Sequence, residues 1–193
     1  MKVAIVKYNA GNIMSVSYAL NRIGIDPIVT DDASILMTAD KVIFPGEGEA
    51  STAMRYLRQR GLDSVLKDLK QPFLGICLGM QLMGSHSEEG DTECLGIFSA
   101  KVKKFPAQDK VPHMGWNQIS EFKSPLLKGI DDKSYVYFVH SYYVELCAET
   151  ATTCNYILPF SAGLQKDNFY AFQFHPEKSG ETGAKILQNF IEL

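Results

Sequence analysis

A cysteine lies between two glycines where an apolar run ends, in the segment FLGICLGMQ (residues 73–81). Gly75 and Gly79 remove side chains on either side of Cys77, which permits the sharp strand-to-helix turn of a nucleophile elbow. A thiol at a helix N-terminus lies at the positive end of the helix dipole, which favours the nucleophilic thiolate. The unpaired N–H of Leu78 in the first helical turn can bind a developing oxyanion. The segment predicts a catalytic cysteine, with a buried structural cysteine as the alternative.

A histidine and a glutamate two residues apart follow the aromatic run FYAFQF near the end of the sequence. Pro176 follows His175, stops strand pairing and fixes the chain direction. In an extended stretch residues i and i+2 point the same way, so Glu177 can hold the imidazole tautomer and stabilise its cation. A lone histidine is more often structural. His-Pro-Glu at a strand end instead predicts a base and an orienting carboxylate for Cys77.

A glycine-rich loop, PGEG at residues 45–48, follows a third apolar run. Its glycines, Gly46 and Gly48, let the backbone approach a ligand closely or expose amide groups. Most such loops are only turns, and phosphate binding is a further alternative. Neither G-x-x-x-x-G-K-[ST] nor G-x-G-x-x-G occurs in the sequence, so an oxyanion-binding loop is the better interpretation.

The first half of the chain alternates short β-rich runs with helical patterns. Strands are predicted at KVAIVK, DPIVT, KVIF and FLGI, which begin at residues 2, 26, 41 and 73. The first helix follows Asn12, a candidate cap, and ends at Gly24, with an apolar face of Ile13, Val16, Leu20 and Ile23. A second, polar-faced helix runs to about Arg60, and LGMQLMGS forms a third. This alternation predicts right-handed parallel crossovers and a sheet covered by helices on both faces.

The second half consists mainly of β-rich runs separated by Gly, Pro, Asp and Asn. These runs are IFSAKVKKF, WNQISEF, SYVYFVHSYYVEL, ATTCNYIL, FSAGLQK and FYAFQFH, and a last helix covers residues 181–193. Hairpins of this kind add antiparallel strands to the parallel sheet. No linker or repeat interrupts the pattern. We therefore expect an α/β fold, a mostly parallel sheet flanked by helices with added antiparallel strands, in a single domain over residues 1–193.

Composition excludes several classes of protein. The chain has 193 residues, 46% hydrophobic and 21% charged, and its net charge of -3 gives no basic surface for nucleic acid. No apolar run approaches the length that spans a bilayer, and the N-terminal residues do not resemble a signal peptide. The other cysteines, Cys94, Cys147 and Cys154, show no C-x-x-C spacing. Cys147 and Cys154 are predicted to be core residues in strands. Cys94 also precedes Leu-Gly, but EEGDTE before it cannot be a buried strand, so no elbow is expected there. Reduced thiols and a cytoplasmic location are expected.

Taken together, PGEG, GICLGMQ and FHPEKS resemble the class I (triad-type) glutamine amidotransferases in order and spacing, over most of the chain. VPHMGWN (111–117) and YFVHSYY (137–143) are similar to the glutaminase subunits of imidazole glycerol phosphate synthase, in histidine biosynthesis. The resemblance implies a flavodoxin-like fold and hydrolysis of glutamine to glutamate and ammonia, with no metal or cofactor.

The resemblance also implies roles for individual residues. Cys77 would attack the side-chain amide of glutamine and form a thioester, and His175 would protonate the departing ammonia. Leu78 N–H and an amide of the Gly46–Gly48 loop would hold the oxyanion. The residues implied to hold the amino-acid end of glutamine are Gln81, Glu89, Ser141 and Tyr142. Glu47 departs from the family pattern, which has an aliphatic residue there, and a carboxylate facing the oxyanion would oppose it.

A partner is implied as well: a β/α-barrel cyclase that receives the ammonia through a channel and makes imidazole glycerol phosphate and an aminoimidazole carboxamide ribonucleotide. Trp116 and Asn117 are interface candidates, because aromatic residues are enriched at contact centres. The alternative for Trp116 is simple burial. Two other enzymes fit the same triad, a stand-alone cysteine γ-glutamyl hydrolase and the amidotransferase subunit of another synthase. A non-catalytic module is disfavoured by the intact Cys77, His175 and Glu177.

Overall fold

The fold is built on a large mixed β-sheet. The computed structural model describes residues 1–9 and 11–193. The helices are α1 (Ile13–Arg22), α2 (Ala33–Thr38), α3 (Ala50–Gln59), α4 (Leu62–Asp68), α5 (Leu78–Met83) and α6 (Gly180–Glu192), with 3-10 turns at Pro125–Leu127 and Pro176–Lys178. The strands are β1 (Val3–Val6), β2 (Ile28–Thr30), β3 (Lys41–Phe44), β4 (Phe73–Ile76), β5 (His86–Ser87), β6 (Thr92–Glu93), β7 (Lys101–Lys104), β8 (His113–Gln118), β9 (Tyr135–His140), β10 (Tyr142–Val144), β11 (Thr150–Tyr156), β12 (Leu158–Lys166) and β13 (Phe169–Phe172).

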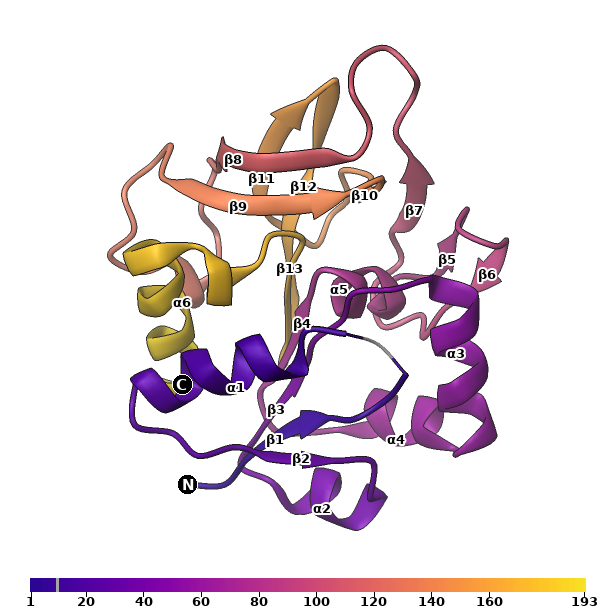
Figure 1. The fold of residues 1–193 in the computed structure, drawn as a ribbon, viewed down its shortest axis with the longest axis vertical. Coiled ribbons are helices and arrows are strands. Elements are labelled where there is room, and N and C mark those ends of the chain that lie inside the picture. Colours follow the sequence, from indigo (N-terminus) through magenta and orange to yellow (C-terminus); the bar gives the residue numbers. More distant parts are fainter. Residues whose placement is uncertain (10) are drawn as a thin grey trace.

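One half of the sheet is parallel, in the order β2-β1-β3-β4-β13. Its central strands are buried on both faces, so apolar side chains alternate between two cores. In β1, Ala4 and Val6 join the core beneath α3, α4 and α5, while Val3 and Ile5 join the core beneath α1 and α6. Figure 1 shows these two helical layers on opposite sides of the sheet. The predicted α/β class is confirmed.

The other half of the sheet is mainly antiparallel. β13 pairs with β12, which pairs with β10 and β11, and β10 pairs with β7. The predicted antiparallel additions are therefore confirmed, with one difference. β8 and β9 form their own two-stranded sheet, which lies across the upper end of the molecule in Figure 1. The ribbon β8–β9 is attached to the parallel half through backbone: His175 N–H donates to the Tyr137 carbonyl at 2.9 Å.

Several short elements differ from the sequence-based expectation. α2, α4, β5 and β6 were not predicted, because each has too few residues for a visible hydrophobic period. α2 forms because Asp32 accepts from the N–H groups of Ser34 and Ile35 as its N-cap. Cys147 lies in a half-buried connection between β10 and β11 and not in a strand, whereas Cys154 is buried in β11 as expected. Cys94 is buried as well.

α5 lies unusually close to β3. A Cβ atom on Gly79 would stand 1.8 Å from the carbonyl oxygen of Phe44, so only glycine permits this approach. The turn before α5 is therefore held against the carboxyl ends of β3 and β4. The residues that follow β1, β3, β4 and β13 meet at this edge, where ligands of open α/β sheets bind.

Candidate active site

Cys77 occupies a strained turn between β4 and α5. Its φ of 53° and ψ of -109° lie in the region that side chains rarely adopt. The turn is locked on both sides, because Cys77 N–H donates to the Phe172 carbonyl at 2.8 Å and the Cys77 carbonyl accepts from Gln81 N–H at 3.1 Å. A Cβ on Gly75 would stand 2.5 Å from Met83 Sδ. The nucleophile-elbow geometry predicted for this segment is present.

His175 and Glu177 form a buried pair. His175 Nδ1 lies 2.7 Å from Glu177 Oε1, and neither side chain is exposed to solvent. The pairing was predicted from an extended stretch, and that geometry is wrong: Pro176–Lys178 is a 3-10 turn, and β13 already ends at Phe172. The turn still brings the carboxylate to Nδ1, because Pro176 starts it with a fixed φ.

The environment of His175 favours the imidazolium. Burial alone would lower the pKa of His175, but the neighbouring Cys77 thiolate and the Glu177 carboxylate outweigh burial and raise that pKa to about 10. Nε2 of His175 is buried and has no hydrogen-bond partner among the residues the structure describes. An imidazolium next to Cys77 is the arrangement that activates a cysteine nucleophile.

Asn12 is a site residue that sequence reasoning placed elsewhere. It precedes α1, but its side chain makes no cap hydrogen bond. Its Nδ2 instead donates to Glu177 Oε1 and lies 3.2 Å from His175 Nδ1. Asn12 has a φ of 73°, a left-handed conformation that asparagine tolerates and that turns the side chain back toward the dyad. Its place after β1 at the carboxyl edge was the only sequence signal available.

A backbone carbonyl of the PGEG loop accepts a hydrogen bond from the residue that follows Cys77. Leu78 N–H donates to the Gly46 carbonyl at 3.3 Å, and the Tyr8 hydroxyl donates to the Pro45 carbonyl at 2.5 Å. A Cβ on Gly46 would stand 2.0 Å from the Tyr8 hydroxyl, so a side chain there is excluded. The Leu78 amide is thus occupied in this structure, and an oxyanion must displace the Gly46 carbonyl to bind it.

The carboxylate of Glu47 is paired with a lysine. Its Oε1 accepts from Lys178 Nζ at 2.6 Å, and its carbonyl accepts from Gly11 N–H at 2.8 Å. Both side chains of the ion pair are partly exposed, at 40% for Glu47 and 35% for Lys178. The ion pair joins the loop after β3 to the turn that carries His175. Pairing with the Lys178 ammonium reduces the repulsion that the Glu47 carboxylate would exert on an oxyanion.

A cavity of about 450 Å³ opens over Cys77. Of the residues implied for substrate binding, those that line it are Glu47, Gly48, Leu78, Gln81, Glu89, Ser141 and Tyr142. Gly46 lies behind the lining and acts through its backbone, and Trp116 and Asn117 lie outside the cavity. Within the residues described, no group of three or more His, Cys, Asp or Glu side chains is arranged to hold a metal ion. No helix among them is long and apolar enough to cross a bilayer.

Two cavity residues have a defined polar role. Glu89 Oε2 accepts from Ala50 N–H at 2.8 Å, and burial raises the pKa of Glu89 above its ordinary value. Gln81 Nε2 donates to the Tyr142 carbonyl and to Gln173 Oε1, each at 3.0 Å. The side-chain oxygen of Gln81, Oε1, therefore remains as the acceptor that a ligand can use. A carboxylate and an amide oxygen suit the ammonium group of an amino acid.

Comparison with known proteins agrees with this site. The family model for class I glutamine amidotransferases matches residues 6–193. The chain is 60% identical to the imidazole glycerol phosphate synthase subunit HisH of Bacteroides thetaiotaomicron and 47% identical to that of Pectobacterium atrosepticum, in each case over the full length of both proteins. Among solved structures, a putative GMP synthase component from Thermoplasma acidophilum superposes with a TM-score of 0.76 at 23% identity, covering 100% of this chain and 93% of the other. That similarity shows the fold.

The chain belongs to the class I glutamine amidotransferase family. Within that family, the full-length relatives quoted above are HisH subunits of imidazole glycerol phosphate synthase.

The charge state of the dyad can be tested directly. In Cys77→Ala the thiolate is gone while burial remains, so the pKa of His175 should fall from about 10 by several units. NMR titration of the histidine ring nitrogens measures this change. Cys94→Ala is the matched control, because Cys94 is a buried thiol whose own pKa burial raises to about 12. An unchanged His175 titration in Cys77→Ala would assign the imidazolium to Glu177 alone.

Asn12 should be needed to hold Glu177. Asn12→Asp keeps the shape but places a second carboxylate against Glu177, and we expect kcat for glutamine hydrolysis to fall about 100-fold, with KM changed less than about threefold. Asn12→Gly tolerates the left-handed backbone and only removes the side chain, so a loss of about tenfold is expected. Steady-state kinetics decide the matter. Equal rates in Asn12→Asp and the unmodified chain would remove Asn12 from the site.

Proposed function

We propose that this chain is the glutaminase subunit of an imidazole glycerol phosphate synthase, a single domain over residues 1–193 that hydrolyses glutamine and supplies ammonia to a partner. The observation that carries the proposal is the Cys77 elbow next to the buried His175–Glu177 pair, opening into a cavity with polar groups suited to an amino acid. Full-length identity of 60% to a named HisH subunit supports the particular synthase.

The reaction follows from the charge state of the site. The Cys77 thiolate attacks the side-chain carbonyl carbon of glutamine, and the electron pair of the C=O bond moves to oxygen. The imidazolium of His175 gives its proton to the departing nitrogen, so ammonia leaves and a γ-glutamyl thioester forms. Neutral His175 then takes a proton from water, whose oxygen attacks the thioester. Collapse of this second intermediate releases glutamate and restores the thiolate and the imidazolium.

The oxyanion of both intermediates needs donors. The Leu78 amide supplies one once the Gly46 carbonyl turns away, and this peptide rotation would present an amide of the PGEG loop as the second. Gly46 permits the rotation, because a residue without a Cβ atom is little restricted in ψ on the side of the peptide that turns. Loss of one such donor typically reduces the rate about 10²–10³-fold. The loop is therefore the point at which a partner can raise the rate.

The residues that line the cavity would orient the substrate. Glu89 and the Gln81 carbonyl oxygen would take the α-ammonium group of glutamine, while Ser141 and Tyr142 lie at the same wall for its carboxylate. The reaction needs no metal or cofactor. All its proton transfers fall to His175.

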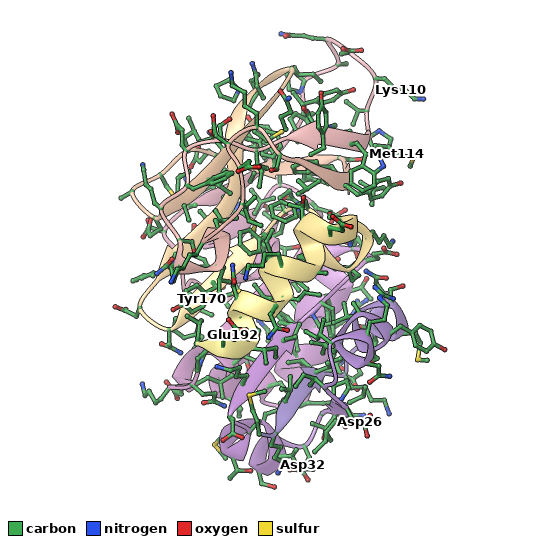
Figure 2. All side chains as sticks on the ribbon, turned by 90° about the vertical axis from the view of Figure 1, so that its left-hand side faces the viewer. Asp26, Asp32, Lys110, Met114, Tyr170 and Glu192 are labelled. Atoms are coloured by element: carbon green, nitrogen blue, oxygen red, sulfur yellow. The ribbon has the colours of Figure 1, made fainter. Side chains whose placement is uncertain are left out.

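The exposed face of the ribbon β8–β9 is the surface that we propose for the partner. Met114, Trp116 and Tyr135 are 61%, 54% and 56% exposed, which excludes simple burial of Trp116. Tyr137 and Val139 of the same ribbon line the cavity, so the exposed face is continuous with the catalytic site. Figure 2 shows Met114 at the periphery of the upper part of the molecule. A β/α-barrel cyclase seated here would receive ammonia without its release to solvent.

Asn117 was predicted as an interface residue, and its side chain makes two contacts within this chain. Its Nδ2 donates to the Asn155 carbonyl at 3.1 Å and lies 3.2 Å from His113 Nε2. Its side chain therefore ties β8 to β11. In this proposal Trp116 makes the partner contact, and Asn117 holds the strand that presents it.

The function is tested by measuring glutamine hydrolysis alone, with the cyclase, and with the cyclase and its nucleotide ligand. Turnover should be slow alone and rise at least 100-fold in the liganded complex, because the oxyanion loop must rearrange. Cys77→Ser should abolish it in all three, and Cys94→Ala should leave it unchanged. Equal turnover alone and in complex would favour a stand-alone γ-glutamyl hydrolase. Mass spectrometry of the co-purified complex identifies the partner.

Trp116 should contribute strongly to association. Trp116→Ala is expected to weaken binding to the cyclase about 30-fold, since buried aromatic anchors at interfaces contribute about 2 kcal/mol or more. Isothermal titration calorimetry provides the dissociation constant. Met37→Ala is the control, because Met37 is equally exposed at 58% but lies on α2, at the opposite end of the molecule. Equal affinities for both variants would place the interface elsewhere.

A further inference from the structure

Gln173 is a buried polar residue for which the mechanism above has no use. It lies between β13 and His175, in the otherwise apolar run FYAFQF, and its side chain is 0% exposed. A buried amide in such a run is costly unless its polar atoms are paired. Its Nε2 lies 3.7 Å from Cys77 Sγ, within the range of hydrogen bonds to sulfur.

The orientation of the Gln173 amide is set by its neighbours. The Tyr142 carbonyl can only accept, so the Gln81 atom facing it at 3.0 Å must be Nε2. The same nitrogen lies 3.0 Å from Gln173, which must therefore present Oε1 to it. Gln173 then turns Nε2 toward the sulfur. The N–H donor at Cys77 thus follows from the hydrogen-bond network as a whole.

The network continues away from the site and stays uncharged. His140 Nδ1 donates to the Tyr142 carbonyl at 2.7 Å, and His140 Nε2 accepts from His113 Nδ1 at 3.0 Å. Burial lowers the pKa of His140 to about 3 and that of His113 to about 4, so both rings are neutral at pH 7. This neutral chain of hydrogen bonds fixes the Tyr142 carbonyl, and through Gln81 it fixes Gln173.

Two groups at Cys77 Sγ favour opposite forms of the sulfur. The Val139 carbonyl at 3.8 Å can accept only from a thiol, whereas the Gln173 N–H at 3.7 Å is best matched to a thiolate. We infer that Gln173 is a further catalytic residue of this site, donating an N–H that stabilises the Cys77 thiolate. The inference rests on the proposed function only for its role in turnover.

The donor acts at two points of the reaction. Before attack it raises the fraction of Cys77 present as thiolate. In the second half of the reaction the C–S bond breaks and its electron pair returns to sulfur, where the Gln173 N–H stabilises the leaving thiolate. Because the other Gln173 atom accepts from Gln81, a ligand ammonium on the Gln81 carbonyl would polarise both amides and strengthen this donor.

The test measures the sulfur itself. Gln173→Glu keeps the shape and an acceptor for Gln81 but replaces the donor with a carboxylate; Gln173→Met keeps the volume and removes all polar atoms. Iodoacetamide alkylation of Cys77 is followed against pH by quantitative mass spectrometry of its peptide, which separates it from Cys94, Cys147 and Cys154. In both variants the pH midpoint of alkylation should rise by about one unit or more, a tenfold loss of reactivity below the midpoint. Kinetics should show kcat reduced about tenfold in Gln173→Met, with KM within about threefold.

Asn189→Leu is the matched structural control. Asn189 is a buried amide on α6 that donates to the carbonyls of Leu126 and Lys128, each at 2.9 Å, and its loss weakens packing without touching the sulfur. Its alkylation midpoint should stay unchanged. The charged and titratable groups around the sulfur are the same in every variant: Tyr8 and His175 interact with it, Glu177 pairs with His175, and His140, Glu47, Lys178 and Glu89 line the same cavity.

The outcomes separate cleanly. A raised midpoint in the Gln173 variants and an unchanged one in Asn189→Leu establishes the donor. An unchanged midpoint in the Gln173 variants, or an equal shift in Asn189→Leu, overturns the inference. Gln173→Met is the decisive variant, because a raised midpoint in Gln173→Glu can also come from the added carboxylate, whereas an unchanged midpoint in Gln173→Glu overturns the inference. Alkylation consumes no glutamine, so a chain without glutaminase activity but with the shifted midpoint would refute the proposed function and leave this inference standing.

Discussion

The site depends on how closely α5 approaches the carboxyl ends of β3 and β4. Gly79 lies against the Phe44 carbonyl with no room for a methyl group, and Gly75 lies under Met83 in the same way. This contact leaves no relaxed path from strand to helix, and Cys77 takes the strained conformation as a result. The packing of Gly79 against Phe44 and of Gly75 against Met83 maintains the strained backbone of Cys77. Because of this strained turn, the Cys77 thiol lies both at the N-terminus of α5 and at the wall of the cavity.

The second constraint is electrostatic. A thiolate and an imidazolium are both costly to bury, and here each compensates for the other within a cluster that also includes Glu177. The carboxylate is in turn held by Asn12 from the loop after β1. Three strand ends, those of β1, β4 and β13, therefore contribute to one charge arrangement. Because the contributing loops are 163 residues apart in the case of Asn12 and His175, the site exists only in the folded chain.

The parts of this site that carry a local signature were predictable from sequence. Glycines at fixed offsets mark Cys77, and a proline marks His175 and Glu177, so the triad and the α/β class follow from short stretches. Asn12 and Gln173 carry no such mark, because their roles are set by partners distant in sequence. The separate ribbon β8–β9 could not be predicted either. Its strands have the same alternating pattern as those that join the main sheet, and strand pairing is decided by tertiary contacts.

The occupied Leu78 amide separates two properties that are usually taken as one, the reactivity of the thiol and its competence for acyl transfer. A haloacetamide reacts at a saturated carbon and develops no oxyanion, so its reaction with Cys77 does not depend on the Leu78 amide. A chloroketone analogue of glutamine adds the sulfur to a carbonyl and needs the amide that the Gly46 carbonyl now holds. Selectivity between these two electrophiles is thus a chemical measure of the loop conformation. A reagent that is selected only for its reaction with the Cys77 thiol in the isolated chain will therefore not report the loop conformation that acyl transfer needs.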